Sequence, residues 1–404
     1  MANAAKLEVR KIVNVIRKKA QTTKEPTASI IADALATAPA AVAGILPISN
    51  QLARTVQRNR AKTNPHPPNP KCRADLVLPT MYRQTKKYEN FLIHDSGEPN
   101  RYLMFGTDKN LEILEKCTEW FADGTFFKGK SLFTQLYTIH GGYEGNVVPL
   151  IYIFLPNKSK EIYRTVLMKL KGFIPDIKLQ RLMVDFEMAF IIACREVFPN
   201  VKIKGCYFHF RQAISRHICQ SSLGSLYNRD LELAHEIKKI CALMFVPSEN
   251  VLSSYEKLKK SSYYAENIEV LSELLSYFET TWIGTPKRRN RGQKAPLFEI
   301  EMWNHYSSVV NGEPRTNNNV EGWYRRLSSR TLKNNSTFWA ILDLIISEQG
   351  FAEVRIEQTD AGHKLNKKRK KYKDYDERLK TVVDNYKQRN TLRYLSGVAH
   401  NITL

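Results

Sequence analysis

Three acidic side chains stand beside segments that the sequence predicts to be strands or helices. Asp123 follows the apolar run of EWFADGTF, Asp185 follows that of LMVDFE, and Glu321 lies in RTNNNVEGWYRRL. We expect Asp123 and Asp185 each to end a buried strand, where α/β folds place their ligands. Two ionised carboxylates that meet repel each other, so they need a cation between them or one of them must be protonated. Hard oxygen ligands of this kind suit Mg²⁺ or Mn²⁺.

Glu321 would complete this set, because a third carboxylate allows two metal ions to be held for in-line phosphoryl transfer. The separations along the chain are 185 − 123 = 62 and 321 − 185 = 136 residues. The second gap is too long for one connection in a compact sheet. Stretches such as DLELAHEIKKICALMFV and NIEVLSELLSYFETTW predict helices between residues 222 and 300. We therefore expect a helical lobe that returns the chain to the site.

Each acid also has a purely structural explanation. Asp123 precedes Gly124, and Asp-Gly is a common turn dipeptide. Asp185 could cap the helix that follows it, and Glu321 could complement a helix dipole as an ordinary first-turn residue. Glu187 would turn away from Asp185 on its helix, which favours a capping or supporting role. Only the joint pattern of the three acids favours a metal site.

The elements that must position these acids predict an α/β sheet of mixed direction. Three neighbouring β-like runs precede a helix–strand–helix–strand–helix series, so hairpins would join the first strands and crossovers would make the later ones parallel. The candidate strands cover residues 101–106, 119–126, 131–142, 146–156, 179–186 and 200–208, and the candidate helices cover 157–173, 187–198 and 210–224. Further helices are expected from Glu321 through Leu327 and in TFWAILDLIISEQGF.

Several separated motifs resemble the Mutator-like (MULE) transposase family. They are DGTF, LPNKSKEIY, VDFEMA, FPNVKIKGCYFHFRQAI and RTNNNVEGW, which occur in this order from about residue 78 to the C-terminus. The resemblance implies a ribonuclease-H-like catalytic core, a mixed sheet flanked by helices and interrupted by an all-helical insertion before the glutamate. It also implies that Asp123, Asp185 and Glu321 form a DDE triad that is catalytic and binds two Mg²⁺ (or Mn²⁺) ions.

The activity that the resemblance implies is DNA transposition. The enzyme would cleave transposon ends and join the 3′-OH to target DNA, so its partners would be double-stranded terminal inverted repeats and target DNA. A homodimer or higher oligomer would bring two ends together. An alternative is a domesticated or inactive relative that binds DNA as a regulator; a nuclease acting on RNA is less consistent with the helical insertion.

Composition agrees with a nucleic-acid partner. The chain has 62 Lys and Arg against 40 Asp and Glu, a net charge of +22, and basic side chains that neutralise phosphates release counterions. Six scattered cysteines predict no disulfide framework and favour a reducing compartment. We expect no signal peptide and no membrane span. The basic run KLNKKRKKYK, residues 364–373, would suit nuclear import, DNA contact or a solvated face, and we expect a nuclear protein.

The patterns divide the chain into six predicted segments. The N-terminal one has apolar residues at helical spacing, with Thr27 or Ser29 and then Ser49 as candidate caps, and suits either a helix-turn-helix reader or a helical cap. No Cys/His spacing before Asp123 fits the FLYWCH-type zinc finger of many relatives. The segments are a helical region (1–63), a linker (64–77), the first part of the core (78–221), an all-helical insertion (222–312), the final core part with Glu321 (313–360) and a basic helical C-terminal tail (361–404).

Cys206 and His209, in KGCYFHF, also match a motif of the family. With His217 and Cys219 they could form a zinc site, but a helix would place His209 and His217 about 12 Å apart, too far for ligands of one ion. We expect Cys206 to pack near the core and His209 to lie near the carboxylates and contact DNA.

Other residues are candidates for contacting phosphates or bases, or for supporting the site. Trp282 and Trp323 could stack on an unpaired base, although packing in the core is the favoured role of each. The remaining candidates are Arg315, Asn318, Arg325, Lys128, Arg288 and Arg289.

Overall fold

The computed structural model describes residues 2–23, 25–63, 66–127, 131–286, 293–330, 337–363 and 370–404. Its contacts divide the chain into two units, Met1–Asn69 and Pro70–Leu404. Among the described residues, no helix has both the length and the apolar character that a membrane crossing requires.

The smaller unit is a group of helices around its own apolar core. The helices are α1 (Ala2–Thr22), α2 (Thr27–Ala36), α3 (Ala40–Ala43) and α4 (Ser49–Thr63). Ile16, Ile30, Leu52 and Val56 meet in this core, as their helical spacing predicts. The predicted cap of α2 is wrong: Pro26 occupies the N-cap position and Thr27 is the first helical residue. Proline suits a helix start because it has no N–H that would need a partner.

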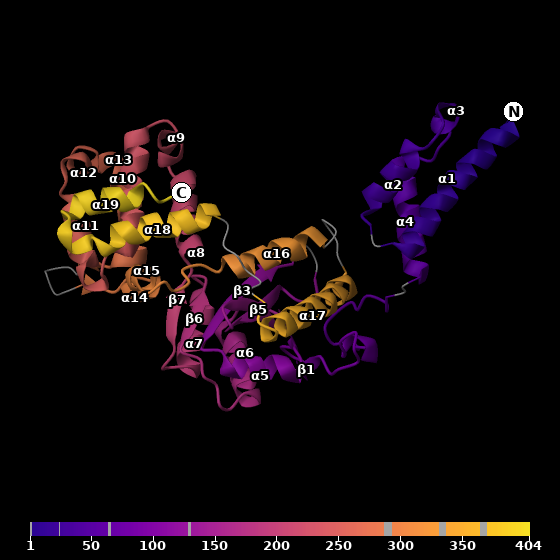
Figure 1. The fold of residues 1–404 in the computed structure, drawn as a ribbon, viewed down its shortest axis with the longest axis horizontal. Helices are drawn as coiled ribbons and strands as arrows, with labels where there is room; N and C mark the ends of the chain where they lie inside the picture. The colour runs from indigo at the N-terminus through magenta and orange to yellow at the C-terminus, as the bar shows by residue number, and fades with distance from the viewer. Residues whose placement is uncertain are drawn as a thin grey trace. The chain divides into compact units, whose positions relative to one another are not determined.

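The larger unit is built on a seven-stranded mixed sheet (Figure 1). Its strands are β1 (Leu92–Asp95), β2 (Leu103–Phe105), β3 (Glu119–Phe126), β4 (Gln135–Tyr143), β5 (Asn146–Leu155), β6 (Arg181–Val184) and β7 (Lys202–Gly205). They lie in the order β1-β2-β5-β4-β3-β6-β7. The predicted α/β class is therefore confirmed, with β1 as an additional edge strand that the sequence did not indicate.

Strand directions follow from the connections. β3, β4 and β5 are antiparallel neighbours, and the β4–β5 turn has positive φ at Glu144 and Gly145, as a tight two-residue hairpin requires. β6 is parallel to β3 and β7 is parallel to β6. The crossovers run through α6 (Lys160–Phe173), which Ser159 caps, and α7 (Met188–Val197). The prediction that hairpins join the first strands and crossovers make the later strands parallel is therefore confirmed.

Two apolar clusters cover the two faces of the sheet. Alternate residues of a strand point to opposite faces, and accordingly Trp120 belongs to one cluster and Phe121 to the other. The Trp120 face packs against α5 (Asp108–Lys116), α6 and α7, and the Phe121 face against α16 (Asn318–Arg330) and α17 (Phe338–Asp360). Trp323 and Trp339 lie almost fully buried on this second face.

A helical lobe fills the sequence between β7 and α16 (Figure 1). Its elements are α8 (Tyr207–Gln220), α9 (Leu223–Tyr227), α10 (Leu231–Ala242), η2 (Leu243–Phe245), η3 (Ser248–Asn250), α11 (Val251–Lys259), α12 (Ser262–Glu266), α13 (Ile268–Phe278), η4 (Glu279–Ile283), α14 (Ile300–Trp303) and α15 (Tyr306–Val310). The prediction of an all-helical insertion is wrong in one place, because β8 (Thr285–Pro286) pairs with β9 (Gln293–Lys294).

The C-terminal helices complete this lobe. α18 (Lys370–Asp384) packs on α15, and α19 (Thr391–Ala399) packs on α10 and α11. Tyr394 is fully buried, and its hydroxyl donates a hydrogen bond to the carbonyl oxygen of Phe245. His235 Nε2 lies 2.8 Å from Ser396 Oγ. The segment predicted as a basic tail therefore contributes a buried apolar face to the lobe.

Candidate metal centre

Asp123 and Asp185 lie on neighbouring parallel strands. In the β3–β6 pair, Phe121 stands opposite Met183, and each aspartate comes two residues later. Asp185 directly follows β6, as predicted. Asp123 does not end its strand: β3 continues to Phe126, and Asp123 itself pairs with Thr138 of β4. β3 is longer than β6 because β4 pairs with it from Trp120 to Phe126.

The pleat places both aspartates on the face that α16 covers. Phe121 and Met183 belong to the apolar cluster on that face, and residues two apart on a strand point the same way. Asp123 is 7% exposed. Its neighbour Gly124 is part of β3 and forms no turn, so the turn explanation of Asp-Gly is wrong. A Cβ at Gly124 would stand 1.8 Å from Gln135 Nε2 and 2.7 Å from Tyr137 Cδ2, so a larger residue would have to displace these side chains.

α16 is fixed to β3 by two long-range hydrogen bonds. Asn317 Nδ2 donates to the carbonyl oxygen of Ala122 at 3.2 Å, and Tyr324 Oη donates to that of Asp123 at 2.8 Å. Residues 317, 321 and 324 occur on one side of a helix, at spacings of four and three. Glu321 therefore faces the sheet, and its side chain is only 11% exposed. The chain thus returns after 136 residues to the strand that carries Asp123.

Burial raises the pKa values of all three acids, and repulsion by neighbouring acids adds to this at Asp123. The pKa of Asp123 rises to about 8, because the side chain is desolvated and Asp185, Glu321 and Glu187 add negative charge; the N–H of Gly124, 2.7 Å from Oδ1, acts in the opposite direction. Burial also raises the pKa of Asp185, while the N–H of Glu187 and the positive charge of Lys158 lower it by a smaller amount. Burial raises the pKa of Glu321 to about 7, although Arg325 and Arg211 oppose this.

The chemistry of these three acids suits a hard divalent cation, although they are not a group whose donor atoms all lie within 4.8 Å of one another in the described structure. All the donors of the three acids are carboxylate oxygens, as Mg²⁺ and Mn²⁺ prefer. Glu321 Oε1 is buried and has no hydrogen-bond partner among the described residues. A buried acceptor without a partner costs about 1–3 kcal/mol, and a cation would remove that cost.

The family comparison is consistent with this geometry. Residues 119–213 match the MULE transposase domain. The match supports a relationship to Mutator-like transposases, and a transposase domain implies action on DNA. The MULE transposase match contains Asp123, Asp185, Cys206 and His209, whereas Glu321 lies outside it. No curated protein matches the chain at a significant level.

Glu187 lies beside Asp185 and does not cap a helix. It stands at the N-cap position of α7, but its side chain makes no capping hydrogen bond, so the predicted capping role is wrong. Oε1 accepts a hydrogen bond from the hydroxyl of Tyr163 at 2.9 Å, and Oε2 lies 3.9 Å from Lys158 Nζ. The carboxylate is therefore held beside Asp185, whose Oδ1 accepts from the N–H of Glu187 at 3.2 Å.

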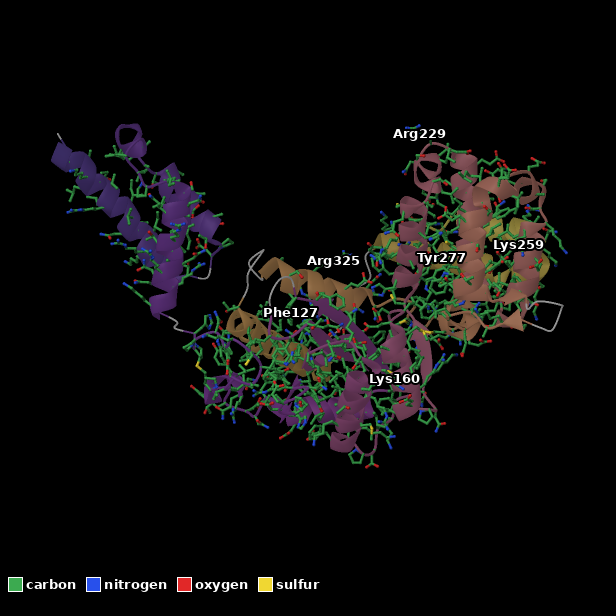
Figure 2. All side chains as sticks on the ribbon, turned by 180° about the vertical axis from the view of Figure 1, so that it is seen from behind. Phe127, Lys160, Arg229, Lys259, Tyr277 and Arg325 are labelled. Atoms are coloured by element: carbon green, nitrogen blue, oxygen red, sulfur yellow. The ribbon has the colours of Figure 1, made fainter. Side chains whose placement is uncertain are left out.

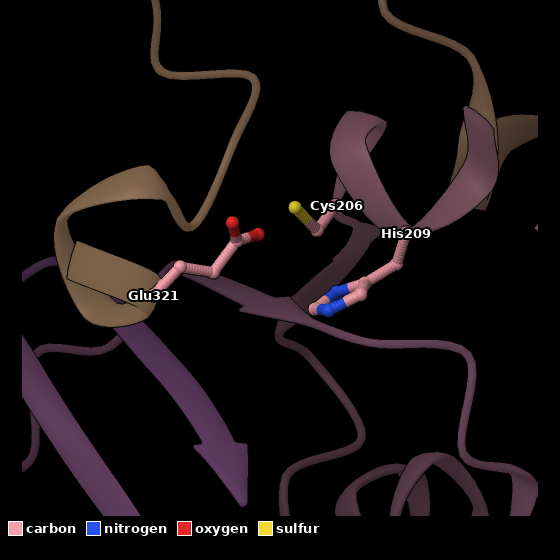
Figure 3. A group of neighbouring side chains, drawn as sticks. All are labelled: Cys206, His209 and Glu321. Atoms are coloured by element: carbon pink, nitrogen blue, oxygen red, sulfur yellow. The ribbon is translucent and has the colours of Figure 1, made fainter. Parts of the chain in front are cut away.

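Cys206 and His209 lie beside Glu321, as Figure 3 shows. One potential ligand atom from each of the three residues lies within 4.8 Å of the other two. The prediction that Cys206 is buried and His209 lies near a carboxylate is confirmed. His217 stacks on Tyr277 and Cys219 is exposed, and neither belongs to this group.

The predicted DNA contacts divide into buried and exposed residues. Trp282 and Trp323 are 1% and 2% exposed, so the prediction that both rings pack in the core is confirmed. Neither ring is open to a base, so the alternative that they stack on one is wrong. Arg315 forms an ion pair with Asp376 of α18, and its contact with phosphate stays a prediction. Asn318 is exposed, and Arg325 is 76% exposed at 3.8 Å from Glu321 (Figure 2). Lys128, Arg288 and Arg289 lie outside the described residues, as does most of the basic run 364–373.

Sequence reasoning missed Asn317 and Tyr324, which hold α16 on β3. Asn317 stands within the run of asparagines in RTNNNVEGW, so one hydrogen-bonding member could not be distinguished from its neighbours. Tyr324 lies three residues after Glu321, and this helical spacing could have indicated that both side chains face the sheet.

Proposed function

We propose that this chain is a DDE-type DNA transposase that cleaves transposon ends and joins the 3′-OH to target DNA. The observation that carries this proposal is the return of Glu321 to the strand of Asp123, on the sheet face that Asp123 and Asp185 share. The MULE transposase match of residues 119–213 supports DNA as the proposed substrate. The resemblance implies a ribonuclease-H-like core, and the mixed sheet is consistent with such a core.

Asp123, Asp185 and Glu321 would hold two Mg²⁺ or Mn²⁺ ions in this function. Bound metals of this kind activate the attacking water or 3′-OH and stabilise the leaving oxygen of the phosphodiester. Rigid elements carry these acids: β3 and β6 position the aspartates, and Asn317 and Tyr324 position the helix of Glu321. Lys158 and Arg325 offset part of the negative charge.

The partners follow from the reaction. The proposed substrates are double-stranded terminal inverted repeats and target DNA, which the net charge of +22 favours. Two ends must be joined in one event, so we propose a homodimer or higher oligomer that acts in the nucleus.

The decisive experiment incubates the purified full chain with DNA that carries the flanking inverted repeats. We expect strand cleavage at the element ends with Mg²⁺ or Mn²⁺, and no cleavage in EDTA. Addition of target DNA should then give joined products. Binding of the repeats with no cleavage in either metal would overturn the proposal and indicate a DNA-binding regulator.

Tyr324→Phe should separate positioning from catalysis. Because the carbonyl oxygen of Asp123 and the hydroxyl of Thr138 lose a buried partner, we expect a stability loss of about 1–3 kcal/mol. Cleavage should slow by roughly tenfold to 100-fold, since a small displacement of Glu321 misplaces the reacting groups. Urea unfolding and cleavage rates at saturating DNA measure the two effects. Tyr372→Phe, at a side chain that is 56% exposed, is the matched control. A destabilised variant that cleaves at the normal rate would exclude a positioning role for Tyr324.

A further inference from the structure

Cys206, His209 and Glu321 bring a sulfur, a nitrogen and an oxygen donor to one place (Figure 3). Cys206 directly follows β7, His209 is in the first turn of α8, and Glu321 is in the first turn of α16. Their potential ligand atoms all lie within 4.8 Å of one another. The proposed phosphoryl chemistry uses neither Cys206 nor His209.

Backbone contacts fix these residues relative to one another. The N–H of Asn317 donates to Cys206 Sγ at 3.2 Å, and the N–H of Tyr207 donates to the carbonyl oxygen of Arg315 at 2.9 Å. The chain that leads into α16 therefore lies against the start of α8. Burial raises the pKa of the Cys206 thiol to about 12, and the N–H groups of Asn317, His209 and Phe208 act in the opposite direction. The thiol therefore keeps its proton until a metal ion displaces it.

Two of the three groups have unused hydrogen-bonding atoms. His209 Nδ1 and Glu321 Oε1 are both buried and have no hydrogen-bond partner among the described residues. Each such atom costs about 1–3 kcal/mol of desolvation. Cys206 is 0% exposed, so its sulfur is shielded from oxidants and from bulk water. The group therefore has the character of a site that a ligand would complete.

We propose that Cys206, His209 and Glu321 bind a divalent cation of the Zn²⁺ class, and that this binding withdraws Glu321 from Asp123 and Asp185. Thiolate, imidazole and carboxylate are the donors that Zn²⁺ takes, and water would fill the fourth position. With bonds of ~2.0–2.3 Å, tetrahedral donors stand about 3.5 Å apart, so the group must contract by roughly 1 Å. The site discriminates against Mg²⁺, because Mg²⁺ prefers oxygen donors.

Binding of the metal ion releases one proton. The Cys206 thiol and the cation form a sulfur–metal bond, and the S–H proton passes to the solvent. No electron is transferred. The binding stands on the geometry of the three residues, whereas its effect on cleavage rests on the proposed function. One carboxylate serves both sites, so occupation of the sulfur site inhibits cleavage.

Cobalt is the probe for binding, because tetrahedral Co²⁺ with a thiolate ligand has a charge-transfer band. The reference protein is Cys72→Ser/Cys219→Ser, which removes the two exposed thiols. We expect one Co²⁺ per chain, displaced by Zn²⁺ and retained in excess Mg²⁺. Adding Cys206→Ser should remove the band and weaken binding at least about 100-fold, since even outer partners of a metal change its affinity by ~10–100-fold. Adding Asp185→Asn instead should leave the band unchanged.

Two outcomes would overturn the site: a charge-transfer band that survives Cys206→Ser, or reference protein that binds no Co²⁺. Circular dichroism of the metal-free variants shows whether the serine variant is folded, and His209→Ala gives a second, independent loss of binding.

The inhibitory effect is measured separately, by titrating Zn²⁺ into cleavage reactions that contain excess Mg²⁺. Rates of each protein are normalised to its own zinc-free rate. We expect Zn²⁺ to stop cleavage by the reference protein at concentrations that leave the Cys206→Ser variant active. Equal inhibition of both would contradict the withdrawal of Glu321. If the reference protein binds Co²⁺ through Cys206 but never cleaves DNA, the proposed function fails while the metal site stands.

Discussion

Asp185→Asn is expected to slow Mg²⁺-dependent DNA cleavage by at least about 10³-fold. Metal ions stabilise the charge of a phosphoryl transition state by several kcal/mol, and each 1.36 kcal/mol is a factor of ten in rate. Asn keeps the shape of the side chain and an oxygen to accept the N–H of Glu187. It loses the negative charge that holds a cation. DNA binding should be retained, because Asp185 adds negative charge to a positively charged protein.

The controls distinguish loss of charge at the site from loss of charge elsewhere. Asp176→Asn removes one exposed carboxylate on the same unit and should leave cleavage unchanged. Glu187→Gln should give a smaller decrease than Asp185→Asn, since Glu187 is held by Tyr163 and Lys158 beside the proposed ligands. Cleavage by Asp185→Asn at the rate of the unaltered protein would remove the metal-site assignment of this residue.

The sequence predicted the sheet well where local patterns determine it. The runs that contain Asp123 and Asp185 are apolar, short and separated by helical periodicity, and they form adjacent strands in the predicted directions. Two local elements in or against the main sheet were missed. β1 is a four-residue strand with only partial burial, and α5 is a short helix whose residues are mostly polar. Such elements depend on their neighbours more than on their own pattern.

The parts that local patterns do not determine are long-range contacts. The hydroxyl of Tyr394 meets the carbonyl oxygen of Phe245 across 149 residues, so nothing near Tyr394 shows that the C-terminal helices complete the lobe. Asn317 donates to Ala122 across 195 residues. The sequence could indicate that Glu321 returns to the sheet, because three acids need one site. It could not show which side chains hold it there, or that its carboxylate lies beside Cys206.

Asp123→Asn is expected to stabilise the metal-free protein, by an amount that grows with pH. The ordinary pKa of Asp123 is 3.8, and in the folded protein it is about 8. Between these values the unfolded chain has released the proton while the folded protein retains it. Stability therefore falls as pH rises from about 4 to 8 and is constant above that range, because the unfolded state binds fewer protons. Removing this acid should gain about 3–5 kcal/mol at pH 8 and almost nothing at pH 4.

The difference between the two proteins is the quantity to measure, because other groups also titrate. Burial lowers the pKa of His140 and His305 to about 3, so these neutral histidines lower the stability as pH falls below their ordinary 6.5. That effect has the opposite sign and cancels when Asp123→Asn is compared with the unaltered protein at each pH. Urea unfolding in EDTA, followed by tryptophan fluorescence, reports on Pro70–Leu404, because all five tryptophans lie there.

Magnesium should reverse the order of stability. A cation that binds the ionised carboxylates stabilises the folded protein by mass action, and Asp123→Asn lacks one of those ligands. With Mg²⁺ at pH 8, the unaltered protein should gain stability and the variant should gain much less. Asp176→Asn should follow the unaltered protein under every condition. If stability in EDTA is the same for Asp123→Asn and the unaltered protein from pH 5 to 8, Asp123 does not carry the buried, repelled carboxylate on which the metal site depends.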